Sequence, residues 1–222
     1  MAVTSIAEGQ HPGEFIVSEA PGEQSRGLIT LANTGGTAIT PAGTILGQVA
    51  SGAATATAAG GNTGNGTMSA VTTAAGVIVG TYHLICIKAA TNAGVFTVED
   101  PNGVTVGEAT VGVAFSGGGL GFTVSDGSTD FVVGDQFTIA VAAGSLKYKA
   151  VNLSGTDGTQ NASVILYDNV DATGGDVTAA AIVRLAEVNA NEIIYPSGAT
   201  TNQKNAINAQ LAANNIIVRA AV

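Results

Sequence analysis

Short runs of alternating apolar and polar residues, bounded by glycine, proline or asparagine, constrain the fold of this chain most strongly. In one such run Phe137, Ile139 and Val141 alternate with polar or small residues. A period of two places one face of a strand in a core and the other face toward solvent. The 31 glycines among the 222 residues supply turns between such strands. The pattern therefore predicts a mainly β protein.

Predicted strands are distributed over three parts of the chain. The N-terminal part has strands over residues 15–18, 27–31 and 44–49, with a turn at Pro21-Gly22-Glu23. The C-terminal part has apolar runs over 164–167 and 216–219. Between them, runs over 76–87, 94–98, 104–106, 109–115, 120–124 and 135–141 predict a small all-β, Ig-like sandwich. The small-residue tract 51–65 offers nothing large to bury, so we expect a linker there.

One helix is predicted near the C-terminus. Thr200 and Gln203 have the spacing of a capping box, in which each side chain accepts from or reaches back to the other's backbone. Ile207 and Leu211 then fall on one helical face. Asn214-Asn215 suits a left-handed stop. The alanine-rich segment 179–186 is ambiguous, because alanine favours a helix.

Composition and charge exclude several classes of function. The net charge is −9 with only seven basic residues, which argues against binding nucleic acid. No apolar stretch reaches the length of a membrane span, so we expect no membrane partner. The first ten residues lack the pattern of a signal peptide, which predicts a protein made and kept in a cytoplasm. The single cysteine, Cys86, lies in an apolar run and is expected to be a small buried side chain.

No convergent catalytic constellation is visible, and we expect no enzyme activity and no cofactor. The two histidines, His11 and His83, offer few candidates for a triad. The glycine run 117–121 lacks the Lys-Ser/Thr of a phosphate loop and suits a hairpin tip. Aspartates cluster in two loops, at 168, 171 and 176 and at 126, 130 and 135. Calcium is one reading of these loops, but Asx turns explain them without a metal, so no metal site is assigned.

An ordered series of motifs runs through the two ends of the chain. The segment Pro41–Gly47 reads PAGTILG, and Lys147-Tyr148 opens the C-terminal part. There follow a turn at 154–158, the strand at 164–167, an acidic loop at 168–176, the strand at 180–188, the segment 193–196, the helix and the strand at 216–219. This series resembles the lambda-like head decoration (capsid-stabilising) protein D family of tailed bacteriophages. The resemblance covers residues 15–50 and 146–222, and it favours a strand over 179–186.

The resemblance implies a domain organisation. Residues 1–14 would be a flexible N-terminal arm, residues 15–50 and 146–222 a discontinuous α+β decoration domain with one short helix, and residues 52–144 an inserted β-sandwich domain. The junctions fall between the strand containing Ile45 and the strand containing Tyr148, which the family joins as a tight hairpin. Hairpin tips accept whole-domain insertions because no buried backbone bond is disturbed.

The resemblance also implies a function. The chain would be a structural virion protein that cements the outer surface of the expanded head at three-fold and quasi-three-fold positions. Its partners would be the major capsid protein and itself as a homotrimer, and the inserted domain would project outward. The residues expected to bind the capsid are Val3, Thr4, Ile6, Phe15, Ile16, Val17, Tyr195 and Pro196. Tyr195-Pro196 stands where the family often has Trp-Pro. The alternative is a phage adhesin or tail-fibre-type module whose β-sandwich binds host-surface glycans, although the absence of tryptophan weakens that reading.

Overall fold

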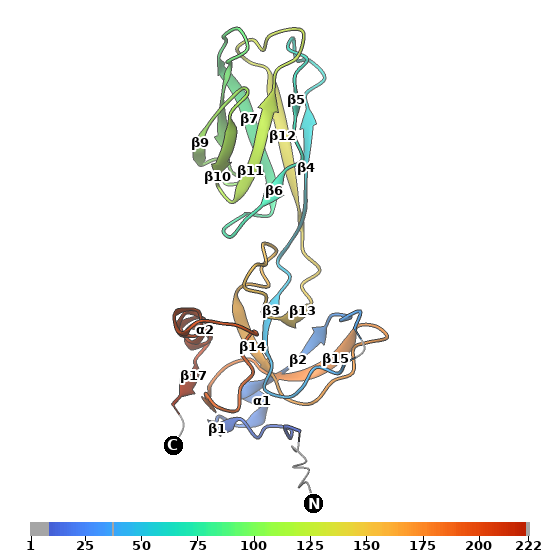
Figure 1. Cartoon of the computed structure of the whole chain (residues 1–222), viewed down its shortest axis with the longest axis vertical. Helices are drawn as coiled ribbons and strands as arrows, with labels where there is room; N and C mark the ends of the chain where they lie inside the picture. Colours follow the sequence, from blue (N-terminus) through green and yellow to red (C-terminus); the bar gives the residue numbers. More distant parts are fainter. Residues whose placement is uncertain (1–8, 37, 221–222) are drawn as a thin grey trace, which may run out of the picture. The chain divides into compact units, whose positions relative to one another are not determined.

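The chain divides into two compact units in the computed structural model, which describes residues 9–36 and 38–220. Unit 1 comprises the described residues up to Val49 together with those from Leu146 onward, and unit 2 comprises Ala50–Ser145. Figure 1 shows unit 2 in cyan to yellow and most of unit 1 in blue, orange and red. Strands hold 43% of the residues and helices 8%, so the prediction of a mainly β chain is confirmed.

A closed barrel of five strands, in the order β13-β2-β15-β14-β3, lies at the centre of unit 1. Strand alternation decides which side chains enter it. In β2, Ile29 and Leu31 are buried, whereas Leu28 faces outward and is 79% exposed. The buried residues of the barrel strands are divided between two apolar clusters, one of which also includes residues of the three-stranded sheet and the C-terminal helix. The strands are β2 (Arg26–Leu31), β3 (Ile45–Gln48), β13 (Tyr148–Ala150), β14 (Ala162–Leu166) and β15 (Val177–Ile182).

A three-stranded sheet and two helices complete unit 1. The sheet has the order β1-β16-β17 and shares a core with the barrel strands and with the C-terminal helix. Its strands are β1 (Ile16–Glu19), β16 (Ala186–Asn189) and β17 (Ile216–Arg219), and the helices are α1 (Gly22–Ser25) and α2 (Thr201–Ala213). Helix α1 is a single turn where we expected a β-turn, so unit 1 contains one helix more than predicted.

Helix α2 follows the predicted pattern closely. Thr200 accepts a hydrogen bond from the Gln203 amide, and the Gln203 side chain caps the Thr200 amide, so the capping box is confirmed. Ile207 and Leu211 are the buried residues of the helix. Asn215 follows the helix with a φ of 58°, which confirms the left-handed stop.

Two glycines of the segment 41–47 are required by close backbone approaches. Gly43 has a φ of +77°, and a Cβ there would lie 2.7 Å from the carbonyl oxygen of Glu192. Gly47 lies on β3, where a Cβ would come within 2.5 Å of the carbonyl oxygen of Thr159. Any side chain at either position would push neighbouring backbone away. The segment therefore fixes how closely β3 packs in unit 1.

Strands β3 and β13 are antiparallel neighbours, although unit 2 separates them along the chain. Tyr148 pairs with Gln48 and Ala150 pairs with Leu46. The ladder of unit 1 extends to Val49, whose amide donates to the Lys147 carbonyl and whose carbonyl accepts from the Leu146 amide, both at 2.9 Å. This pairing is the one expected from the sequence.

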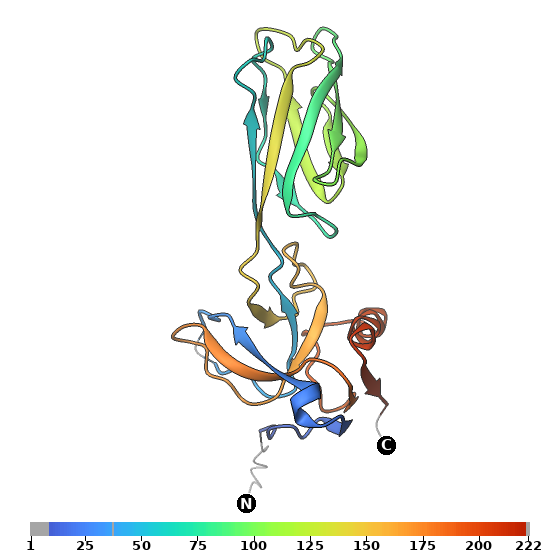
Figure 2. The same cartoon turned by 180° about the vertical axis from the view of Figure 1, so that it is seen from behind.

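Two sheets enclose the core of unit 2 (Figure 2). The larger has the order β4-β12-β7-β8-β9, and in the smaller β11 pairs with β10, β5 and β6. Phe96, Phe131 and Phe137 meet edge to face with ring centroids 5.1–5.6 Å apart. The strands are β4 (Ser51–Ala58), β5 (Thr67–Met68), β6 (Thr72–Thr73), β7 (Gly80–Lys88), β8 (Val95–Glu99), β9 (Thr105–Thr110), β10 (Ala114–Gly117), β11 (Leu120–Ser125) and β12 (Gln136–Ala143).

The prediction of a linker over 51–65 was wrong for its first half. Residues Ser51–Ala58 form β4, which pairs with β12. At one end Ala58 lies opposite Phe137, and at the other Ser51 lies opposite Ala143. Ala54 and Ala56 pack against the core, and Thr55 and Thr57 face outward. The tract has the period of a strand, but alanine carries little hydrophobic signal, so the alternation was missed.

Two predicted strands are each divided in the structure. The predicted strand over 109–115 is split into the end of β9, at Thr110, and the start of β10, at Ala114. Gly112 turns the chain between them with a φ of +79°. The run 180–188 is divided between β15 and β16, which belong to different sheets, with Leu185 at a φ of 52° between them. The alanine-rich segment is therefore β, as the resemblance implied, but it is interrupted. The strand expected from residue 76 begins only at Gly80.

Candidate interaction surface

The residues expected near the N-terminus differ in what they expose. Val3, Thr4 and Ile6 lie outside the described residues. Phe15 is 2% exposed and packs in the core of unit 1, so it offers no side-chain surface. Ile16 is half-buried against the same core, and Val17 is 53% exposed.

Strand β1 is an edge strand. It pairs only with β16 within its sheet, in an antiparallel register that shifts between Ile16 and Ser18. An edge strand carries backbone groups that another chain can pair with, and a bulge limits that pairing. Strand β1 therefore has an open edge on which the register shift limits pairing with another strand, and it exposes one apolar side chain, Val17.

The chain before β1 is attached to unit 1 from Gln10 onward. The Gln10 side chain donates to the Glu192 carbonyl at 2.6 Å, and the Asn169 side chain donates to the Gln10 carbonyl at 2.9 Å. The Gly13 amide donates to the Tyr167 carbonyl at 3.1 Å. The predicted arm thus has an anchored root, residues 10–14, which fixes where the preceding residues leave the unit.

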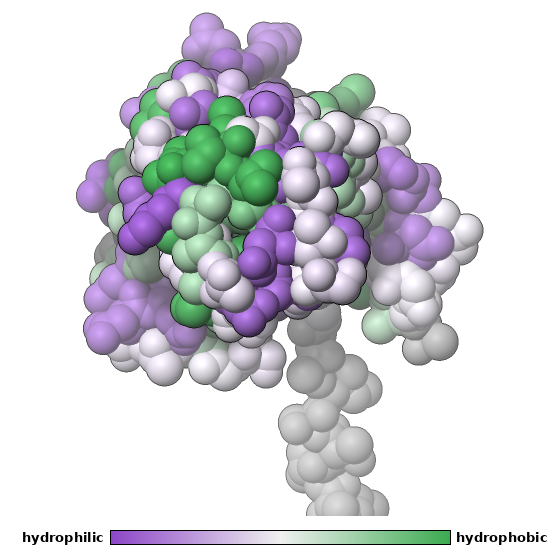
Figure 3. Space-filling view, turned by 90° about the horizontal axis from the view of Figure 1, so that it is seen from above, coloured by the Kyte–Doolittle hydropathy of each residue, from purple (hydrophilic) through white to green (hydrophobic). Residues whose placement is uncertain are grey.

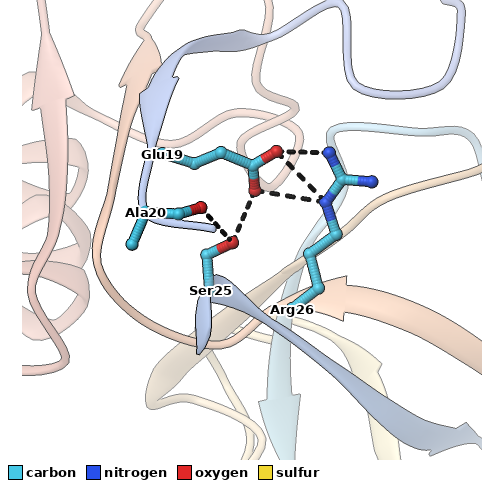
Figure 4. Close-up of polar contacts among 4 residues, drawn as sticks. All are labelled: Glu19, Ala20, Ser25 and Arg26. Atoms are coloured by element: carbon cyan, nitrogen blue, oxygen red, sulfur yellow. Dashed lines mark hydrogen bonds and ion pairs between the residues drawn. The ribbon is translucent and has the colours of Figure 1, made fainter. Parts of the chain in front are cut away.

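An ion pair fastens the end of β1 to the start of β2 (Figure 4). The Arg26 guanidinium pairs with the Glu19 carboxylate, and Nε of Arg26 donates to both carboxylate oxygens at 3.1 and 3.2 Å. The Ser25 hydroxyl donates to the same carboxylate at 2.6 Å, with the Ala20 carbonyl at 3.2 Å. Hydrogen bonding from Arg26 holds the pKa of Glu19 below its ordinary value.

One hollow on unit 1 contains Tyr195 and Pro196 in its lining and has a volume of about 760 Å³. Ile39, Leu153, Tyr195 and Pro196 form part of its wall, and the buried Ile45 also lines it. None of the described residues that line it carries a formal charge. A neutral, partly apolar concavity of this kind suits a packed contact with another neutral surface.

Tyr195 is held in place at this hollow. Its hydroxyl donates to Oδ1 of Asn208 at 2.7 Å, and the Lys204 ammonium lies 5.2 Å from its ring centre. Burial raises the pKa of Tyr195. Asn208 and Lys204 both lie on α2, so the helix fixes the orientation of the ring. Pro196 is half-buried beside it. The structure thus brings Tyr195 and Pro196 together in one wall, but it does not place them with Val17 in one surface.

Three aspartates of the two acidic loops bind neighbouring protein groups. Asp171 accepts from the Thr173 amide and hydroxyl, at 3.0 and 2.6 Å, which is an Asx turn. Asp176 pairs with Lys147 and accepts from the Asn33 amide. Asp135 is buried and accepts from three backbone amides of unit 2. Within residues 9–36 and 38–220 no three His, Cys, Asp or Glu side chains are grouped so as to hold a metal ion.

Unit 2 keeps all its aromatic rings inside. Tyr82 and the five phenylalanines of this unit, all of whose residues are described, are between 0 and 8% exposed. His83 is exposed on β7, and Cys86 is fully buried, where burial raises the pKa of its thiol. The exposed apolar residues of unit 2 are aliphatic, and Figure 3 shows hydrophobic residues gathered in one patch on the face seen from above.

Sequence reasoning missed three features of unit 1. The stacking of Arg26 on Tyr167 joins residues far apart in the chain, and no local pattern announces it. The hollow depends on four separate segments. Leu28 belongs to an apolar run, and the sequence does not show which of its residues face outward. The structure shows that Ile29 and Leu31 face the core and that Leu28 faces solvent.

No helix in the described part of the chain has the length and apolar character needed to cross a bilayer. A search of curated proteins gives no match. Among solved structures, the chain is similar to FlgL of Xanthomonas campestris, with 23% identity over 49% of this chain and 34% of that one and a TM-score of 0.34. The hook junction protein FlgK of Burkholderia pseudomallei matches with 23% identity over 62% and 23% and a TM-score of 0.32. The chain spans about a third or less of the length of these proteins, and such low TM-scores support no conclusion about fold or function.

One family model matches nearly the whole chain. Its description is bacteriophage lambda head decoration protein D, and it covers residues 5–216. The match includes both parts of unit 1 and spans unit 2. The chain therefore belongs to the bacteriophage lambda head decoration protein D family, whose members are structural, non-enzymatic proteins on the outer capsid surface of the virion.

Proposed function

We propose that this decoration protein cements the expanded phage head. In this proposal it sits as a homotrimer at three-fold and quasi-three-fold positions of the major capsid protein, and it holds neighbouring capsid subunits together against the pressure of the packaged DNA. The observation that carries the proposal is the family match over residues 5–216. A contact made only with the expanded shell stabilises that state by mass action, so the unexpanded procapsid should not be bound.

The capsid contact in this proposal uses the arm, residues 2–14, and the exposed side of β1. The anchored root supports it, because Gln10 and Gly13 tie the chain to unit 1 immediately before β1. Val17 adds an exposed apolar side chain, and its neighbour Ile16 packs against the core of unit 1. Main-chain pairing by an extended arm requires no strong side-chain signature. Tyr195 and Pro196 serve the assembly through a separate contact, at the neutral hollow.

Unit 2 projects away from the shell in this proposal. Its two connections leave unit 1 at adjacent strands, since β3 and β13 are paired up to Val49 and Lys147. A domain attached at one hairpin can be carried without a change in the contacts of the unit that holds it. The loss of unit 2 should therefore leave capsid binding intact.

The deciding experiment is a titration of purified protein onto expanded capsids that lack it, imaged by electron cryomicroscopy. The expected result is density in clusters of three on expanded heads, none on procapsids, and unit 2 at the outer radius. Single copies on the heads would contradict the trimer, and equal binding to procapsids would contradict the expansion-dependent mechanism. A variant with Val17→Asp should bind heads more weakly, whereas the matched exposed position Val104→Asp in unit 2 should not.

A second candidate is a phage adhesin or tail-fibre-type module whose sandwich binds host-surface glycans. The exposed hydrophobic patch on the face shown in Figure 3 favours a partner for that face. The burial of every aromatic ring of unit 2 argues against sugar stacking, which commonly uses aromatic faces. Density on tails, with none on heads, would favour this candidate over cementing.

A further inference from the structure

Unit 1 presents an apolar knob on the outside of its barrel. Leu28 is 79% exposed, the largest value among the exposed large hydrophobic residues that the structure describes. It lies on β2 opposite Ala180 of β15, and Thr30 and Thr178 pair next along the same face. These four side chains carry no charge, and their strands hold the knob rigidly in place. A rigid, neutral surface with one prominent aliphatic side chain is typical of an interface.

The hollow of unit 1 offers an uncharged socket whose lining combines apolar side chains with polar ones such as Thr40 and Asn152. Its walls include Ile39, which is 54% exposed, together with Leu153, Tyr195 and Pro196. Its lining is free of charge among the described residues, and its volume of about 760 Å³ admits a leucine with its neighbouring residues. A charged partner would lose water there without gaining an opposite charge. A neutral apolar knob is the partner that fits.

The knob and the socket are different places on one unit. Leu28 is not among the residues that line the hollow, so a copy does not fill its own socket in this structure. When two different patches of identical chains meet, the contact is heterologous, and it closes into a ring if the rotation between copies allows it. We propose that Leu28 of one copy enters the hollow lined by Ile39 and Tyr195 of the next copy, and that repetition of this contact closes the trimer. The inference rests on the trimer of the proposed function and names the surfaces that make it.

Cysteine cross-linking tests the pairing directly. Two full-length variants, Leu28→Cys and Ile39→Cys, are purified separately, mixed, bound to expanded heads and treated with a short bismaleimide. The expected result is a cross-linked pair in the mixture and none with either variant alone. The unmodified protein is the blank, because its single thiol at Cys86 is fully buried. Cross-linking within Leu28→Cys alone would show a symmetric contact and overturn the proposal.

The double variant, with both cysteines in one chain, tests closure. A closed ring predicts cross-linked products of up to three copies and no longer ladder. A ladder beyond three would show an open chain of copies and overturn the ring. Heads that carry clusters of three without any cross-link in the mixture would also overturn the pairing, while the cementing function would stand.

Substitution of the knob supplies a second measurement. Leu28→Asp should weaken association between copies at least tenfold, because the charge would be buried in the neutral socket, whereas Leu28→Met should retain it. Val133→Asp, at an exposed valine of unit 2, is the control. Circular dichroism should show all three variants folded. If the protein did not bind heads at all, the proposed function would fail, and cross-linking of the same mixture at high concentration in free solution would support or overturn the contact separately.

Discussion

The guanidinium carbon of Arg26 lies 4.1 Å from the centre of the Tyr167 ring. The same guanidinium pairs with Glu19, so one side chain joins the end of β1 to a residue that follows β14. The amide of Gly13 donates to the carbonyl of Tyr167. The Gly13 amide and the Arg26 guanidinium thus both contact Tyr167, so this residue links the root of the arm to the start of the barrel.

Arg26→Ala should lower the stability of unit 1 by about 1 kcal/mol, the sum expected for a partly exposed ion pair and a cation–π contact. The estimate is kept low because the Arg26 side chain is 37% exposed and solvent screens the pair. Arg26→Lys should recover only part of the loss, because lysine lacks the planar fork. Urea unfolding of the three proteins provides the measurement, and equal midpoints for all three would contradict the assigned role.

The same pair gives a pH dependence with a definite sign. The pKa of Glu19 is lowered in the folded chain by hydrogen bonding from Arg26. Its contribution is therefore fully present above the ordinary glutamate pKa of about 4.3 and is lost as the pH falls through the lower folded value. The stability difference between the wild type and Glu19→Gln should shrink below about pH 4. A difference that grows in acid would contradict this assignment.

Asp135→Asn should destabilise unit 2 by about 2 kcal/mol. Burial alone would raise the pKa of this carboxyl, but donation from the backbone amides of Gly64, Thr63 and Val132 outweighs it and holds the pKa below its ordinary value. The NH2 group of asparagine would face at least one of these backbone amides, donor against donor, and leave that amide without an acceptor. Thermal unfolding followed by differential scanning calorimetry measures the change, with Glu108→Gln on the exposed side of β9 as the control.

Tyr82→Phe should cost about 2 kcal/mol through two unpaired backbone groups in unit 2. The Tyr82 hydroxyl donates to the Gly118 carbonyl at 2.9 Å and accepts from the Ile78 amide at 2.8 Å, and the residue is fully buried. Phenylalanine fills the same space without either bond. Thr81→Val, at the adjacent exposed position, should be close to neutral. Hydrogen exchange should accelerate first around Ile78 in the Tyr82 variant.

Thr200→Ala should cost about 1 kcal/mol, because it removes the N-cap of α2. The neighbouring substitution Thr201→Ala leaves the cap intact and improves helix propensity, so it should not destabilise. Both variants can be compared by urea unfolding. Loss of the cap should also loosen Gln203, which lines the hollow, and thereby weaken association between copies.

The elements that were predictable are those with local signals. The capping box at Thr200 and Gln203 fixed the start of α2, and the alternation at Phe137 fixed β12. The strand over Ser51–Ala58 was missed because its alternation is between alanine and threonine, which differ little in hydrophobicity. Leu185 lies between β15 and β16 at a φ that leucine rarely adopts, so no residue preference marked that break.

The interaction surface was less predictable than the fold. Pro196 and Tyr195 were expected from the resemblance to serve an assembly contact, but the hollow they line requires Ile39 and Leu153 from other segments. Phe15 was expected to contact the capsid, but it lies just before β1 and packs in the core of unit 1. Such a site is formed by residues that are distant in the sequence and close in space, and a single sequence indicates this closeness only where a known motif is present.

The paired strands β3 and β13 bring the two connections to unit 2 next to each other in unit 1. Within unit 2 the ends also meet, since the Gly144 amide donates to the Ala50 carbonyl at 3.0 Å and Ser51 pairs with Ala143. A domain whose own termini are adjacent adds little to the entropic cost of closing the loop when it stands in place of a hairpin tip. Under the proposed function, a different domain with adjacent termini would be accommodated at the same two points while the contacts within unit 1 stay unchanged.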